Sequence, residues 1–121
     1  MKVTRVAHVS VNVETNLDNT RSFYRDVLGL GDVPRPDIPG VAGHWHAIGD
    51  AELHLVDAPH AGHGIDPTGP HFCVYVEDLD AAIRELDAAG IEHLRGAQGD
   101  VLQIWIVDPA GNTIELQQDK G

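Results

Sequence analysis

The sequence has a single cysteine among 121 residues, Cys73, so it can form no internal disulfide bond. It also lacks any run of about 18 apolar residues, the length that a membrane-spanning helix needs. Residues 1–13 alternate as a strand does, without the apolar core and cleavage site of a signal peptide. These absences predict a cytoplasmic protein, in a reducing compartment, with no membrane partner.

Basic residues are scarce as well. There are 8 lysines and arginines against 19 acidic residues, which gives a formal net charge of −11. Such a chain repels backbone phosphates, so we expect no nucleic-acid partner. No cluster of lysine or arginine indicates a phosphate or coenzyme A pocket. The acidity is compatible with a cationic ligand or a bound metal ion but requires neither.

Histidine, in contrast, is abundant. Eight residues of the chain are histidine, roughly three times the usual ~2% share. Because cysteine is almost absent, this composition favours a metal site built from nitrogen and oxygen donors over one built from thiolates.

The chain contains an internal repeat. Segment 8–18 reads HVSVNVETNLD and segment 71–80 reads HFCVYVEDLD, and with one gap they align so that His8 matches His71. Each segment alternates as a strand does. Two such segments indicate two structural units of the same kind.

The later parts of the two halves also match. AIGDAELHLV (47–56) aligns with IVDPAGNTIELQQ (106–118), each reading as a strand, a tight turn and a second strand. On this alignment His54 matches Glu115. The repeat therefore pairs two potential metal ligands with two others.

Helices are predicted between these parts, at about residues 17–28 and 79–89. Each follows a strand and an aspartate, Asp18 or Asp80, that can cap a helix. Both predicted helices end at a glycine, as helices often do.

Each half thus has the element order β-α-β-β-β. The first module covers about residues 3–57 and the second about 70–118, with a linker or lid rich in proline and glycine at about 58–69. We expect one domain, residues 1–121, made of these two modules.

Four potential metal ligands share one predicted face. Side chains of a strand alternate between faces, and the apolar neighbours of His8, His54, His71 and Glu115 should pack against the helices. If the opposite face curves into a cup, three imidazoles and one carboxylate converge there. This set suits Zn²⁺, Ni²⁺, Fe²⁺, Co²⁺ or Mn²⁺. A lone strand histidine is more often a surface residue, but four donors at repeat-equivalent positions favour a metal site.

A substrate pocket is predicted around these ligands. Gln103 and Trp105 lie on the same face of their strand, and Trp45 and His46 lie on the strand before the turn at 49–51. Tryptophan is also common in cores and dimer contacts, so that alternative stays open for Trp45 and Trp105.

Three further residues have weaker functional readings. Cys73, next on the face after His71, is interpreted as a small filler, with a soft metal ligand as the alternative. His60 and His63 belong to the linker and are expected to be solvated or part of a mobile lid.

Four segments carry a family resemblance: VAHVSVNV (6–13), FYRDVLGL (23–30), GPHFCVYVEDLDAA (69–82) and DPAGNTIELQQ (108–118). Together they resemble the vicinal oxygen chelate superfamily. That superfamily includes glyoxalase I, extradiol dioxygenases, fosfomycin-resistance thiol transferases, methylmalonyl-CoA epimerase and bleomycin-binding proteins. The resemblance covers essentially the whole chain and is more specific for the fold than for the reaction.

The resemblance implies an α+β fold in which paired βαβββ modules form a cupped eight-stranded mixed sheet, with helices on the outer face, around a divalent metal ion. In the glyoxalase I pattern, ligands stand on the first and last strands of each module, which here carry His8, His54, His71 and Glu115. The chain departs from that pattern at residue 54, where glyoxalase I enzymes of this layout carry glutamate.

The function implied first is that of a metal-dependent lyase or isomerase of glyoxalase I type, which binds a small substrate through vicinal oxygens. Glu115 would be the catalytic base and His54 its partner. An Fe(II)-dependent extradiol-type dioxygenase using His8, His71 and Glu115 is the alternative, and a metal-free drug-binding resistance protein is another. Because exposed sheet edges promote pairing, we also expect a homodimer, and the repeat is satisfied equally by a metal site built within one chain or across two.

Overall fold

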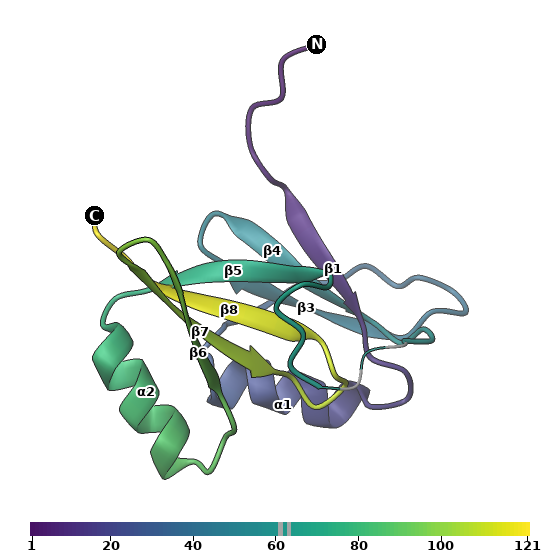
Figure 1. Ribbon diagram of the computed structural model, residues 1–121. Coiled ribbons are helices and arrows are strands. Elements are labelled where there is room, and N and C mark those ends of the chain that lie inside the picture. Colours follow the sequence, from purple (N-terminus) through teal and green to yellow (C-terminus); the bar gives the residue numbers. More distant parts are fainter. Residues whose placement is uncertain (61, 63) are drawn as a thin grey trace. The chain divides into compact units, whose positions relative to one another are not determined.

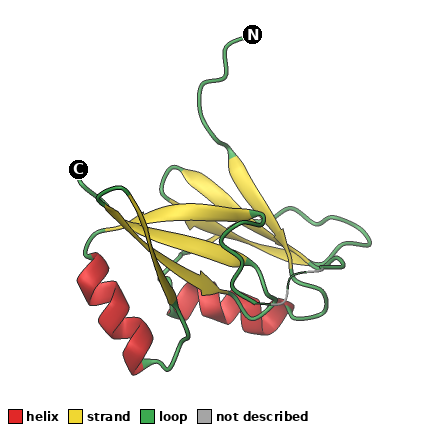
Figure 2. Cartoon of the chain, viewed as in Figure 1, coloured by secondary structure: helices red, strands yellow, loops and turns green. Residues whose placement is uncertain are grey.

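The computed structural model describes residues 1–60, 62 and 64–121, so the predicted linker residue His63 lies outside the described residues. Two compact units make up the chain, Met1–Ala61 and Gly62–Gly121. Each contains one βαβββ module with its own four-stranded mixed sheet and one helix (Figure 1). The predicted α+β class and the paired βαβββ modules are therefore confirmed. Figure 2 shows the strands in yellow and the helices in red.

The first unit has the sheet order β1-β4-β3-β2, with β1 parallel to β4 and the other pairs antiparallel. Its helix packs against β3 and β4, and Leu53 and Leu55 are fully buried beneath it together with Tyr24 of the helix. The elements of this unit are β1 (His8–Asn12), α1 (Leu17–Asp26), β2 (Asp32–Val33), β3 (Gly43–Ile48) and β4 (Ala51–Val56).

The second unit repeats this arrangement with the order β5-β8-β7-β6, and β5 is parallel to β8. Its core is formed by apolar side chains of β7 and β8, such as Ile104 and Ile114, and by Leu86 of its helix. The elements are β5 (His71–Val76), α2 (Leu79–Ala88), β6 (Leu94–Gln98), β7 (Val101–Val107) and β8 (Thr113–Gln118).

The prediction of the helix-capping residues is wrong. The helices are capped by Asn16 and Asp78, so that Asp18 and Asp80 lie inside the first turns; the Asp78 carboxylate accepts a hydrogen bond from the Ala81 backbone, as a capping side chain does. The first strand begins at His8; the residues before it are exposed, although the Ala7 backbone oxygen still accepts a hydrogen bond from the Glu52 N–H of β4. No helix among the described residues is long and apolar enough to cross a membrane.

Gly43 allows β3 to approach β4 closely. A Cβ atom placed on Gly43 would lie 2.4 Å from the Leu55 backbone oxygen, inside van der Waals contact. We expect Gly43→Ala to lower the free energy of unfolding by about 2 kcal/mol, because the backbone of a central strand must shift to admit the methyl group. Urea denaturation measures this change.

Gly31→Ala is the matched control. A Cβ atom on Gly31 meets no atom within 4 Å, and the residue has no positive φ. The control should change the free energy of unfolding by no more than about 0.5 kcal/mol. Equal stability of the two variants would contradict the close approach at Gly43.

Candidate functional site

The pairing of β4 with its neighbours places His54 on the face of the first sheet that points away from α1. In β3, Trp45 lies directly opposite His54, and in β1, Ser10 does so. His8 lies opposite Glu52, two residues before His54. Since residues two apart on a strand share a face, His8, Trp45, Glu52 and His54 form one surface.

The ring of His54 is held on three sides. It stacks on Trp45, with ring centroids 3.8 Å apart and planes 3° apart, and on His8, at 4.1 Å and 15°. Its Nε2 atom lies 2.9 Å from the Glu52 Oε1 atom. His54 is 9% exposed. The Glu52 contact occupies Nε2 and leaves Nδ1 as the ring atom for a metal ion or a proton.

The second sheet has an equivalent surface. Trp105 of β7 lies opposite Glu115 of β8, as Trp45 lies opposite His54. His71 lies opposite Thr113, two residues before Glu115, as His8 lies opposite the residue two before His54. The register thus reproduces the repeat that the sequence indicates. It also shows that Trp45 and Trp105 occupy equivalent positions in the two sheets.

His71 and Glu115 lie next to each other, with the His71 Nε2 atom 3.4 Å from the Glu115 Oε1 atom. The other ring nitrogen of His71, Nδ1, lies 2.9 Å from the Gly69 backbone oxygen. That contact fits an Nδ1–H donor, which leaves the Nε2 lone pair free to bind a metal ion. The Trp105 ring lies edge-on to His71 at 4.9 Å.

The Glu115 carboxylate is oriented by two amides. It is only 4% exposed, and its Oε2 atom accepts hydrogen bonds from the Nε2 atoms of Gln103, at 3.1 Å, and Gln117. Its Oε1 atom is the one turned toward His71. A buried carboxylate with one oxygen bound by amides and the other beside a free imidazole nitrogen fits a metal ligand with its supporting contacts.

The predicted pocket residues separate into two groups. Trp45, Gln103 and Trp105 contact His54, Glu115 and His71 respectively, in the ring and amide contacts described above. His46 does not join them. It lies opposite Leu53 on the helix side of the sheet, so strand alternation points it away from Trp45.

His46 is fully buried, and its ring lies 5.9 Å from that of Tyr24. Burial lowers the pKa of His46, and the charge of His44 lowers it further. The nearby Asp32 carboxylate opposes this shift. His46 therefore belongs to the core side of the first sheet.

His60, in the stretch that follows β4, is half-buried.

Two contacting residues were missed by the sequence reasoning. Glu52 stands where the second module has Thr113, so the repeat gave no reason to select it. Gln117 shares the face of Glu115, and the sequence alone does not show that its amide reaches the Glu115 carboxylate. Strand alternation predicts the face of both residues, but the contacts that they make within that face do not follow from it.

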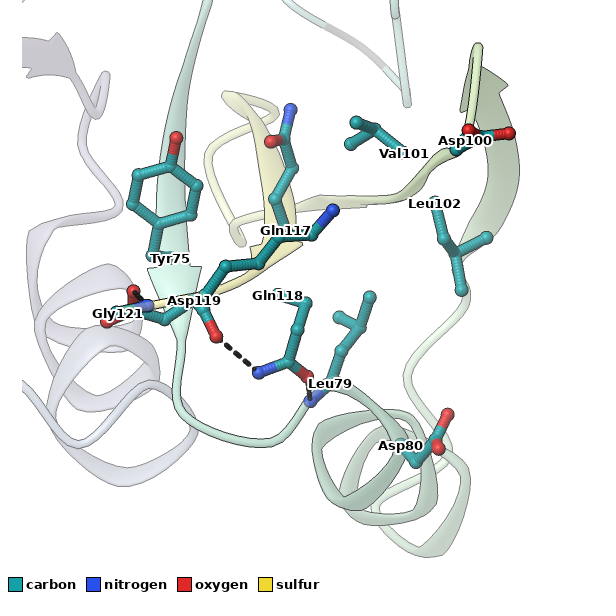
Figure 3. Close-up of a pocket in the computed structure, with 11 residues that line it drawn as sticks. Tyr75, Leu79, Asp80, Asp100, Val101, Leu102, Gln117, Gln118, Asp119 and Gly121 are labelled. Carbon is teal, nitrogen blue, oxygen red and sulfur yellow. Dashed lines mark hydrogen bonds between the residues drawn. The ribbon is translucent and has the colours of Figure 1, made fainter.

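A cavity of about 410 Å³ opens in the second unit, beside the end of β8 (Figure 3). Tyr75 and Gln117 line it from neighbouring strands, and Figure 3 shows both side chains rising from the sheet on the same side. Gln117 also donates to Glu115, so one amide connects the cavity to the candidate ligand. Asp80, Asp100 and Asp119 contribute acidic groups to its rim.

Cys73 lies opposite Glu115 in the sheet. Partial desolvation of the sulfur, with the neighbouring Glu115 carboxylate, raises the pKa of the Cys73 thiol to about 11, although the residue as a whole is exposed. A thiol with this pKa stays protonated at neutral pH, which fits the filler interpretation.

We expect alkylation of Cys73 in the chelator-treated protein to keep accelerating about tenfold per pH unit up to pH 10, because only the thiolate reacts. Iodoacetamide labelling followed by mass spectrometry measures the rate, and free cysteine, which levels off near its own pKa, is the control. A plateau at or below pH 9 would contradict the raised pKa.

Comparisons with known proteins identify the family. A sequence model described as the Glyoxalase/Bleomycin resistance protein/Dioxygenase superfamily matches residues 5–116. The chain belongs to this superfamily.

Relatives within the superfamily have different activities. Glyoxylase I 4 of Arabidopsis thaliana is 30% identical over 130 residues, covering 96% of this chain and 71% of that protein. The mitochondrial methylmalonyl-CoA epimerase of Mus musculus is 32% identical over 134 residues, covering 97% and 74%. The crystal structure of lactoylglutathione lyase from Agrobacterium tumefaciens is similar with a TM-score of 0.77 and 25% identity, covering 99% of this chain and 97% of that one.

Proposed function

We propose that this chain is a metal-dependent enzyme of lyase or isomerase type, similar in chemistry to glyoxalase I, that acts on a small substrate with adjacent oxygen atoms. The observation that supports it most is the pair of His71 and Glu115. Both are already oriented by partners, and each presents an unshared donor atom toward the other. Such supporting contacts are typical of metal ligands.

We propose His8, His54, His71 and Glu115 as the ligand set of one divalent ion. Each module supplies only two of these donors, whereas ions such as Zn²⁺ take at least three protein ligands. One ion shared by both pairs satisfies this requirement. Three imidazoles and a carboxylate suit Zn²⁺, Ni²⁺, Fe²⁺, Co²⁺ or Mn²⁺. Bound there, the ion would act as a Lewis acid toward the substrate oxygens.

Proton transfer falls to Glu115 and His54. When it is partly released from the metal ion, the Oε1 atom of Glu115 would accept a proton from the carbon next to a substrate carbonyl, because Oε2 is already bound by amides. If its Nδ1 atom is not bound to the metal ion, His54 would hold or return a proton there, with its ring oriented by Glu52 at Nε2. Trp45 and Trp105 shield these groups from water.

The names of the relatives suggest the substrates to test first. Lactoylglutathione and methylmalonyl-CoA, which stand in the names of two relatives, are both thioesters. We also propose that the protein is a cytoplasmic homodimer. The dimer is supported by the two edge strands of each four-stranded sheet, which another chain can cover. Light scattering measures the dimer.

The experiment is metal analysis of protein purified without added metal, followed by turnover assays with Ni²⁺, Zn²⁺, Fe²⁺ and Mn²⁺. The assays follow lactoylglutathione and the epimers of methylmalonyl-CoA. The proposal predicts a bound divalent ion and chelator-sensitive turnover. Full activity after complete removal of metal would contradict it.

A dioxygenase is the second candidate, and the contact between His54 and Glu52 favours it. If that contact keeps His54 from the metal ion, then His8, His71 and Glu115 remain, a two-histidine, one-carboxylate set typical of Fe(II) oxygenases. Uptake of oxygen with a catechol, dependent on Fe²⁺, would establish this alternative. Tight binding of bleomycin that a chelator leaves unchanged would instead support a metal-free resistance protein.

A further inference from the structure

A second group of metal-type side chains lies on the helix side of the first sheet. Asp32 of β2 and His44 and His46 of β3 bring one donor atom each to within 4.8 Å of one another. The Asp32 Oδ1 atom lies 2.8 Å from His44 Nε2 and 3.4 Å from His46 Nδ1. All three residues belong to the first unit.

The local sequence produces this cluster by strand alternation. His44 and His46 are two residues apart on β3 and therefore share a face, whereas Trp45 between them points to the opposite one. Asp32 pairs directly with His46 across the short β2–β3 ladder. The same strand thus contributes to two different surfaces of the sheet.

The buried ring of His46 is a second observation, independent of the clustering, that indicates a bound ligand. It is fully buried, and neither of its ring nitrogens makes a hydrogen bond of normal geometry with any described residue. Buried polar atoms are almost always satisfied, so an imidazole left in this state is unusual. Its Nδ1 atom faces Asp32 Oδ1 at a distance at which a metal ion can bridge them once the side chains adjust.

Arg25 also belongs to this cluster. Its guanidinium lies 3.1 Å from Asp32 Oδ2 and 3.3 Å from Oδ1. Through Oδ2 it orients the carboxylate, as partners of metal-bound carboxylates do. Its charge also weakens the attraction for a cation, so we expect moderate affinity.

We propose that Asp32, His44 and His46 form a second site for a divalent transition metal ion of the Zn²⁺ class, separate from the His8, His54, His71 and Glu115 set. Two imidazoles and a carboxylate are three protein ligands, which leaves a position for water. An ion here would tie the two-residue strand β2 to β3.

Equilibrium dialysis of the full chain against Zn²⁺, after chelator treatment, tests the site. The variants are His44→Gln and Asp32→Asn, because both side chains are partly exposed, unlike the buried His46, and should leave the fold intact, which circular dichroism checks. The control is His93→Gln. His93 is another half-buried histidine beside a carboxylate, with its Nε2 atom 3.6 Å from Asp87, but with no third donor described nearby.

Each test variant should lose one Zn²⁺ equivalent per chain, or bind it at least about tenfold more weakly, since even indirect partners of a metal ion contribute that much. The control should bind as the unmodified chain does. The same loss is expected in a His8→Ala/Glu115→Gln background, which separates this site from the first. Unchanged zinc number and affinity in His44→Gln and Asp32→Asn would overturn the proposal, whatever happens at the first site.

Discussion

Replacing Glu115 by glutamine is expected to lower kcat/KM by at least about a hundredfold and to remove the metal ion of the proposed centre. General acid–base groups contribute on the order of 10² to 10⁴ in rate. The amide has nearly the shape of the carboxylate and can still contact Gln103 and Gln117, but it lacks the charge and the basic oxygen that Glu115 presents to His71. The variant therefore tests the chemistry of Glu115 more than its packing.

The readouts are metal content and the rate with any substrate that the unmodified chain turns over. Glu92→Gln, the same change at an exposed residue between α2 and β6, is the control and should keep both values. Retention of metal and of more than about half the activity in Glu115→Gln would remove this residue from the proposed centre.

The largest effect on stability is expected at Leu53. Its side chain is fully buried between β4 and α1, on the opposite face of the strand from His54. Leu53→Ala removes buried methyl groups and leaves a cavity, so the free energy of unfolding should fall by about 2–5 kcal/mol. Because Leu53 precedes His54, this core also positions the candidate ligand.

Leu94→Ala is the matched control for this prediction. Leu94 stands on a strand as Leu53 does, but it is 44% exposed. We expect the control to lose less than about 1 kcal/mol. Urea denaturation compares the two, and equal losses would mean that the face assignment of β4 is wrong.

The repeat made most of the fold predictable. Two halves with strand alternation, a helix and a second pair of strands leave few arrangements other than paired βαβββ modules, and the register of β1 with β4 repeats in β5 with β8. The helix caps were less predictable. Asn16 and Asp78 each compete with a nearby aspartate for the same role, and the sequence pattern cannot separate neighbours two residues apart.

The face on which each candidate site residue lies could be predicted wherever the alternation of side chains along a strand was used. Leu53 and Leu55 fixed the face of His54, and the structure places it there. His46 was grouped with Trp45 because both lie in one histidine-rich segment, although neighbours on a strand must point to opposite faces. The Glu52 contact of His54 could not be predicted, since it depends on side-chain orientation within a single face.

The structure adds most to the interpretation of residue 54. Histidine there departs from the glyoxalase I pattern, yet a carboxylate remains within reach of the same position, because Glu52 contacts the His54 ring. This pairing gives the first module an imidazole and a carboxylate on one face, as His71 and Glu115 do in the second. The arrangement of these residues thus supports the proposed metal centre more strongly than it supports any single reaction.

The metal content of two double variants tests the central proposal most directly. One is His8→Ala/His54→Ala and the other is His71→Ala/Glu115→Gln, so that each removes the donors of one module. If the two pairs hold one ion, each double variant loses the same single equivalent of metal per chain, and the combined fourfold variant loses no more. Loss of a separate equivalent from each pair, or no loss from either, would contradict a shared metal centre.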